Sequence, residues 1–200
     1  CGGNALALRI RDVGTVKTLR SAYSSDTASN AATKPRLVIN FSIDPEATNS
    51  CIKGITEKTT VSSINSSNND VRWFSDSSGS LERTTTSLDI NYLEKNKSGT
   101  VVRRRYSGIR FQDLQIPKGA VITSAVLKVR TADSDYTNVQ PVSIKAFTDP
   151  NIDFCPTTGC LTPSDINAKL LTTAIATWSR STLSENTWYD SSTPIDVKDV

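Results

Sequence analysis

The chain has 200 residues, with 23 Lys and Arg, 20 Asp and Glu, and neither His nor Met. This length suits one domain that buries a sizeable hydrophobic core. The absence of His excludes Ser-His-Asp and Cys-His nucleophile systems and every His-based metal site, and a formal net charge of +3 is too small to indicate a nucleic-acid partner.

Short strands are predicted from the first residues on. The apolar run over residues 5–10 predicts a strand, and residues 36–41 predict a half-buried strand because Leu37, Ile39 and Phe41 alternate with other residues. Residues 44–54, which contain Cys51, are interpreted as a linker. The strand pattern then restarts over residues 56–64.

Residues 101–131 predict two strands joined by a tight turn. Pro117 fixes φ for the first central position of that turn, and Gly119 tolerates positive φ. Alternation in the second strand places one set of side chains on a common face: Val121, Thr123, Ala125, Leu127 and Val129.

The last part of the chain is predicted to be rich in loops. Residues 149–163 form a long connection, Ser164 is a candidate cap for one helical turn over residues 164–170, and residues 172–178 have the β-branched content of a strand. The predicted fold class is all-β, a jelly-roll-like β-sandwich with at most one or two short helical turns.

Four cysteines allow three disulfide pairings. Cys155 and Cys160 enclose four residues that include Pro and Gly, so a local disulfide is predicted there, which leaves Cys1 and Cys51 as the second pair. A zinc site is the alternative, but there is one close pair alone and its spacing is wider than the common zinc knuckle. Disulfides imply an oxidising compartment. Ser and Thr make up roughly a quarter of the chain, well above ordinary usage, as suits an extracellular surface.

The segment GIRFQDLQIPKGAVITSAVLKV, residues 108–129, resembles the repeated motif of DNRLRE-like modules. These are secreted bacterial β-sandwich modules that occur in tandem in cell-surface fibre and adhesin proteins and are related to carbohydrate-binding modules. Residues 61–71 and 87–90 resemble the first strands of such a module, and residues 171–179 and 188–190 resemble its later strands.

The order of the resembling segments is circularly shifted. Residues 1–43 resemble the C-terminal strands of a module, residues 44–54 the linker, and residues 55–200 the N-terminal and central part. Three interpretations follow: the chain closes on itself, residues 1–43 complete a neighbouring copy, or the sequence is a window of a tandem repeat. The last two imply a linear fibre and are favoured over a closed monomer. In these two interpretations, the residues at the interface between copies are Leu6, Leu8, Ile10, Leu37, Ile39 and Phe41.

Candidate ligand sites are few. Asp133 and Asp135 offer oxygen ligands for calcium, the one cofactor that the sequence suggests, although they lack the pattern of an EF-hand loop and a polar turn is the simpler interpretation. Trp73 lies in a polar segment and is the best candidate for an exposed ring that stacks on sugars, whereas Trp178 and Trp188 are predicted to pack in the core. The run from Arg103 to Arg105 is expected to pair with carboxylates or to solvate a strand.

Catalysis is not expected. Asp70 and Asp76 are a formal pair of carboxylates, but nothing in the sequence sets the separation that a glycosidase needs. The predicted function is a structural subunit or repeat of an extracellular filament or adhesive surface stalk, assembled by head-to-tail β-strand complementation. Its partners are copies of itself, with no nucleic acid and no membrane span. The alternatives are a carbohydrate-binding module for surface glycans and a pilus-tip or calcium-stabilised adhesin domain.

Overall fold

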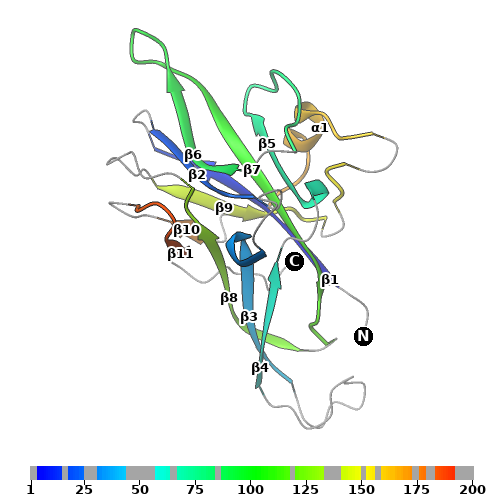
Figure 1. Ribbon diagram of the computed structural model, residues 1–200. Coiled ribbons are helices and arrows are strands. Elements are labelled where there is room, and N and C mark those ends of the chain that lie inside the picture. The colour runs from blue at the N-terminus through cyan, green and yellow to red at the C-terminus, as the bar shows by residue number, and fades with distance from the viewer. Residues whose placement is uncertain are drawn as a thin grey trace.

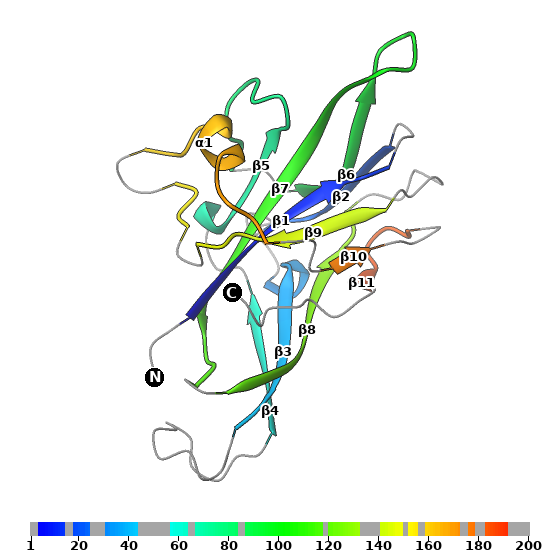
Figure 2. The same ribbon diagram turned by 180° about the vertical axis from the view of Figure 1, so that it is seen from behind.

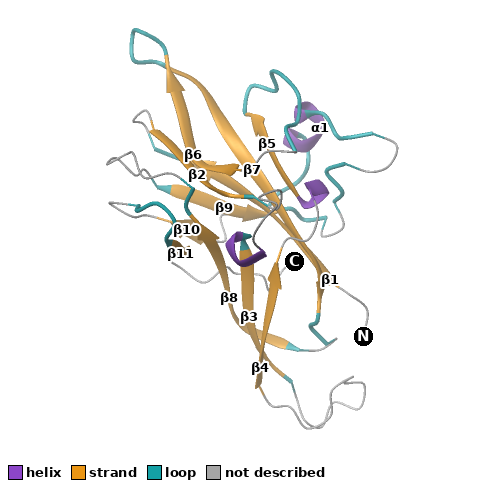
Figure 3. Cartoon of the chain, in the orientation of Figure 1, coloured by secondary structure: helices purple, strands orange, loops and turns teal. Residues whose placement is uncertain are grey.

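In the computed structural model, the chain forms two antiparallel β-sheets whose apolar faces pack against each other (Figure 1). The structure describes a set of segments that covers most of the chain: residues 4–14, 18–24, 31–43, 57–63, 67–83, 87–117, 120–132, 141–149, 152–155, 159–172, 176–178 and 183–191. Strands dominate these segments (Figure 3). The prediction of an all-β sandwich is confirmed.

The larger sheet has seven strands. Its order is β10-β9-β1-β7-β6-β2, and β5 also pairs with β7. The strands are β1 (Asn4–Asp12), β2 (Thr18–Tyr23), β5 (Asp70–Phe74), β6 (Ser87–Lys95), β7 (Val101–Leu114), β9 (Val142–Ala146) and β10 (Ala176–Trp178).

The smaller sheet has four strands in the order β11-β8-β3-β4. They are β3 (Arg36–Ser42), β4 (Glu57–Ser63), β8 (Val121–Arg130) and β11 (Trp188–Asp190). The helical segments of the described residues are short: η1 (Ala31–Thr33), η2 (Ser67–Asn69) and α1 (Pro163–Asn167). The strands predicted over residues 5–10, 36–41, 56–64 and 101–131 are therefore present.

The main core lies between the two sheets. Ile109 and Phe111 of β7 and Leu127 and Val129 of β8 meet there, together with apolar residues of β1 and β3. Alternation along each strand turns one set of side chains into this core and the other set outward. In β3 this gives buried Leu37, Ile39 and Phe41, as the sequence predicts.

One predicted face is wrong at the start of β8. Ala125, Leu127 and Val129 are buried, but Val121 is exposed and Ile122 packs against the core instead. The register between β3 and β8 shifts between Asn40 and Phe41. A bulge of this kind leaves one residue unpaired and reverses the alternation beyond it, which the pattern of a single strand does not reveal.

A second cluster of buried residues covers the outer face of the larger sheet. Its members come from β1, β5, α1 and the segment between β9 and β10: Ala7, Val71, Trp73, Phe147, Ile152, Phe154 and Ile166. We call the described residues between 147 and 172, namely 147–149, 152–155 and 159–172, the cover segment. In Figures 1 and 2, α1 and β5 lie together on one side of β7, opposite the smaller sheet.

The N-cap of the helix in the cover segment lies two residues earlier than the sequence suggests. Thr162, not Ser164, is its N-cap, and its hydroxyl accepts a hydrogen bond from the Asp165 amide at 3.2 Å. The Asp165 carboxylate accepts in return from the Thr162 amide at 2.8 Å, which completes a capping box. Pro163 then occupies the first turn, where its missing N–H costs nothing.

Candidate functional site

The six residues predicted to form an interface lie in the main core of the chain itself. Leu6, Leu8 and Ile10 of β1, like Leu37, Ile39 and Phe41 of β3, are at most 3% exposed. Burial of one such side chain stabilises by about 1.5–3 kcal/mol. These two strands therefore carry a large share of the stability of the sandwich.

Both strands lie inside their sheets rather than at an edge. β1 pairs with β7 on one side and with β9 on the other, and β3 lies between β8 and β4. Residues 1–43 thus supply β1, β2 and β3 to strands formed later in the chain (Figures 1 and 2).

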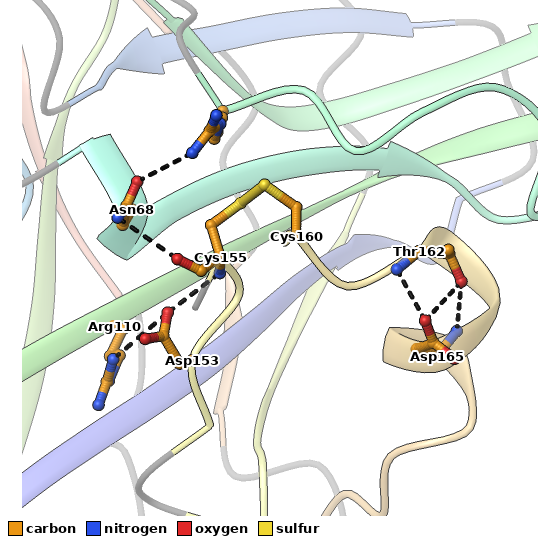
Figure 4. Close-up of a disulfide and its surroundings, with 8 residues drawn as sticks. Asn68, Arg110, Asp153, Cys155, Cys160, Thr162 and Asp165 are labelled. Atoms are coloured by element: carbon orange, nitrogen blue, oxygen red, sulfur yellow. Dashed lines mark hydrogen bonds and ion pairs between the residues drawn. A yellow bond between two sulfur atoms is a disulfide. The ribbon is translucent and has the colours of Figure 1, made fainter. Parts of the chain in front are cut away.

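The cover segment is clipped by a disulfide between Cys155 and Cys160, which confirms that predicted pair (Figure 4). The Asp153 carboxylate accepts a hydrogen bond from the Cys155 amide at 3.0 Å and lies 3.8 Å from the Arg110 guanidinium. The predicted partners Cys1 and Cys51 lie outside the described residues. The clip holds Phe154, which is fully buried, against the outer face of the larger sheet.

Trp73 is not the exposed ring that the sequence suggests. It is 1% exposed, and its indole N–H donates to the Asn167 side chain at 2.8 Å. Its ring meets Tyr106 edge to face, with 5.6 Å between centroids. The prediction was wrong because the cover segment packs on Trp73, and the polar residues around Trp73 in the sequence do not reveal that contact.

The other aromatic residues near the C-terminal strands differ in how deeply they are buried. Trp178 is buried in the main core as expected, and Tyr189 packs against its edge. Trp188 is half-buried, and the Arg36 guanidinium lies over its ring at 4.8 Å from the centroid. None of the three offers the flat, open platform that stacking on a sugar requires.

Two residues of the arginine run pair with carboxylates, as expected. Arg103 bonds Glu94 at 2.6 Å and Arg105 bonds Asp89 at 3.1 Å. Both guanidiniums also lie over the Phe74 ring. Arg104 instead donates to the Gly14 carbonyl at 2.9 Å.

The acidic candidates do not assemble into a site. Asp133 and Asp135 lie outside the described residues, and within the described part of the chain no three His, Cys, Asp or Glu side chains gather as metal ligands. Asp70 is buried, whereas Asp76 is exposed and accepts hydrogen bonds from Ser78. These bonds lower the pKa of Asp76. No described helix is long and apolar enough to cross a membrane.

Arg9 and Arg11, which were not among the predicted site residues, lie outward on β1 over the Tyr106 ring. The signal was present, because Arg alternates with Leu8 and Ile10 in a strand pattern. Arg9, Arg11 and Tyr106 come together by the pairing of β1 with β7.

Comparison of the chain with protein-family models, with curated proteins and with solved structures finds no match. The geometry described above is therefore the basis of the functional proposals.

Proposed function

We propose that the chain is a structural module of an extracellular filament or adhesive surface stalk, in which copies are joined by exchange of residues 1–43. The observation that carries the proposal is the position of β1 and β3. Each is an internal strand of its sheet, and both come from the one segment that precedes residues 44–56. A copy without this segment lacks a central strand in both sheets.

Exchange conserves every contact of the closed chain. β1 of one copy makes the same register with β7 and β9 of the next, and β3 the same register with β8 and β4. The closed and the exchanged forms therefore differ mainly in the effective concentration of the segment and in the path of residues 44–56. Because a head-to-tail contact that does not close on itself propagates, exchange gives a linear polymer.

The covalent chemistry supports an extracellular location. The Cys155–Cys160 disulfide needs an oxidising compartment to persist. Disulfides of this kind stabilise the subunits of an extracellular polymer, which chaperones inside the cell do not reach.

Cross-linking of paired positions on β3 and β8 tests the exchange. Val38 and Val126 are directly opposite each other, and both are half-buried on the outward face, so cysteines there lie close to the separation that a disulfide needs. Copies with Val38→Cys and copies with Val126→Cys are mixed, unfolded with reductant and refolded together at high concentration in a redox buffer. Exchange predicts cross-linked dimers in which mass spectrometry finds peptides joined at positions 38 and 126.

The matched control uses a pair that lies within residues 57–200. Lys128 and Asp190 are directly opposite on β8 and β11, so copies with Lys128→Cys mixed with copies with Asp190→Cys give no specific dimer under exchange. Electron microscopy of the refolded native chain provides a second readout, with filaments expected. Monomers without a 38–126 link, together with compact particles in the micrographs, would show that the chain only closes on itself.

A further inference from the structure

Three cations form a row on the outer face of the larger sheet. Arg9 and Arg11 share one face of β1, opposite to the face of Leu8 and Ile10 that enters the main core. Lys145 of β9 lies directly opposite Arg9. We call Arg9, Arg11 and Lys145 the basic row.

Tyr106 of β7 holds the two arginines close together. The guanidinium carbon of Arg9 is 4.9 Å from the centroid of the Tyr106 ring, and that of Arg11 is 5.8 Å from it. Burial lowers the pKa of Arg9, the electrostatic effect of Tyr106 opposes this, and the neighbouring charge of Arg11 lowers the pKa further. Like charges placed together on one face of a sheet destabilise it, so this arrangement costs stability.

The basic row has no acidic partner among the described residues. Several other cations of the sheets are neutralised at short range: Arg72 by Glu82 at 2.5 Å, Arg103 by Glu94 at 2.6 Å and Lys128 by Asp190 at 2.9 Å. In contrast, no described carboxylate pairs with the basic row, and the Nε atoms of Arg9 and Arg11 are buried without a hydrogen-bond partner. Within the described part of the chain, no carboxylate thus compensates the positive charge of the basic row.

The basic row borders the cover segment. Arg9 pairs with Gly108, and a Cβ atom at Gly108 would lie 2.9 Å from the ring of Phe154, so the cover segment rests on the sheet at that point. One step further along the strands, Arg11 pairs with Tyr106. The side chains of the basic row are half-buried. They therefore lie beside the cover segment and are partly exposed to solvent.

We propose that the basic row binds the carboxylate or sulfate groups of an acidic polysaccharide. Guanidinium groups bind planar and tetrahedral oxyanions through paired N–H donors, and a low local dielectric strengthens such bonds. The row crosses β9 and β1 towards Tyr106 of β7, and the neighbouring outward residues Ser143 and Thr177 are polar. This role is additional to the proposed exchange of residues 1–43 and stands or falls separately from it.

Two other polyanions fit less well. A nucleic-acid site needs many phosphate contacts, commonly about six to ten, whereas the row has three cations and the chain a net charge of +3. A membrane surface needs apolar side chains that enter the headgroup region beside the cations, and Ser143 and Thr177 do not provide them. A short row of paired donors matches the spaced acidic groups of a sugar chain.

Isothermal titration of the full-length chain tests the proposal with defined probes. A heparin hexasaccharide carries sulfate and carboxylate groups, hexagalacturonate carries carboxylate alone, and cellohexaose is neutral. We expect binding of at least one acidic probe that weakens with salt, and no binding of cellohexaose. The two acidic probes separate a sulfate site from a carboxylate site, and a DNA hairpin of similar charge is the competing polyanion.

Paired variants localise the binding. Arg9→Gln/Arg11→Gln removes two charges from the basic row and is expected to weaken binding at least tenfold. The control, Arg36→Gln/Arg130→Gln, removes two charges from the smaller sheet, where these arginines also lie over aromatic rings. We expect the control to leave binding within about twofold. Lys145→Gln, at a half-exposed position, is the second variant should the first not fold, and we expect it to weaken binding severalfold. Equal losses in the two double variants, tighter binding of the DNA hairpin, or binding of cellohexaose as tight as that of the acidic probes would each overturn the proposal.

Discussion

Asp89 is a carboxylate held away from water between two arginines. It is 2% exposed, and its Oδ2 atom lies 3.1 Å from Arg105 and 3.6 Å from Arg72. Burial raises the pKa of Asp89, and the two arginines counteract this without cancelling it. The site thus shows which of two opposing effects is larger: the loss of hydration exceeds the gain from two nearby positive charges.

The raised pKa of Asp89 predicts how stability depends on pH. Between its ordinary pKa of about 4 and the raised pKa, Asp89 retains its proton in the folded chain but not in the unfolded chain. The folded state therefore binds more protons, and stability falls as pH rises through the raised pKa. Denaturant titration gives the difference in the free energy of unfolding between the wild type and Asp89→Asn at each pH. We expect this difference to decline from pH 4 upward and then to level off. A rise over the same range would show that the ion pairs dominate, and Asp190→Asn, in an exposed pair with Lys128, is the matched control.

Gly108 marks the point where the cover segment approaches the backbone of β7. A Cβ atom there would lie 2.9 Å from Phe154 Cζ and 3.1 Å from Val71 Cγ2. We expect Gly108→Ala to destabilise the chain by about 1–3 kcal/mol, the usual cost of overpacking, as measured by thermal and denaturant unfolding. Phe154→Leu combined with Gly108→Ala should recover part of that loss. An unchanged stability in Gly108→Ala would mean that the cover segment does not press on β7.

At the scale of elements, the cover segment is the part of the fold that turns one face of a sheet into a second core. Phe147 and Phe154 pack edge to face with 5.9 Å between centroids, and Ile166 of α1 joins them. Asn167 ties α1 to β5 by accepting from Trp73 and donating to the Ser77 hydroxyl at 3.0 Å. Besides these hydrogen bonds, the packing of the buried aromatic and aliphatic side chains and the Cys155–Cys160 disulfide hold the segment.

Removal of the disulfide tests this account of the cover segment. A loop this short contributes about 2 kcal/mol by restricting the unfolded chain, and Cys155→Ala/Cys160→Ala should lower the free energy of unfolding by about that amount. Hydrogen exchange should become faster within residues 152–172 and remain slow in β3 and β8. Reductant added to the double variant isolates any effect of Cys1 and Cys51. Uniformly faster exchange would show that the cover segment unfolds together with the sandwich.

At the scale of the whole molecule, the main core is shared between the first 43 residues and the remainder. Phe41 and Leu37 of β3 share this core with Leu127 of β8, which lies far from them in the sequence. Pairing over such distances forms slowly, because the loop must close before the contacts stabilise it. In the proposed exchange, we expect a neighbouring copy at high concentration to compete for the same strands during that delay, so the cross-linking experiment refolds the copies together.

The sequence by itself determined the strands and the local chemistry. Alternation along residues 36–41 and within residues 125–129 identified the buried faces, since a strand turns every second side chain to the same side. The spacing of Cys155 and Cys160 identified the disulfide, because a short turn brings its ends together. A similar alternating pattern covers residues 142–146, in which Val142, Ile144 and Ala146 are buried. No strand was predicted there.

Tertiary structure decided everything that depends on which residues meet across strands. It buried Trp73 under the cover segment, it reversed the face of Val121 through a bulge opposite β3, and it placed Lys145 beside Arg9. Burial, register and the charge around an arginine are properties of neighbours from distant parts of the chain. A pattern within one strand does not contain them, so the basic row became visible only when β1, β7 and β9 were seen side by side.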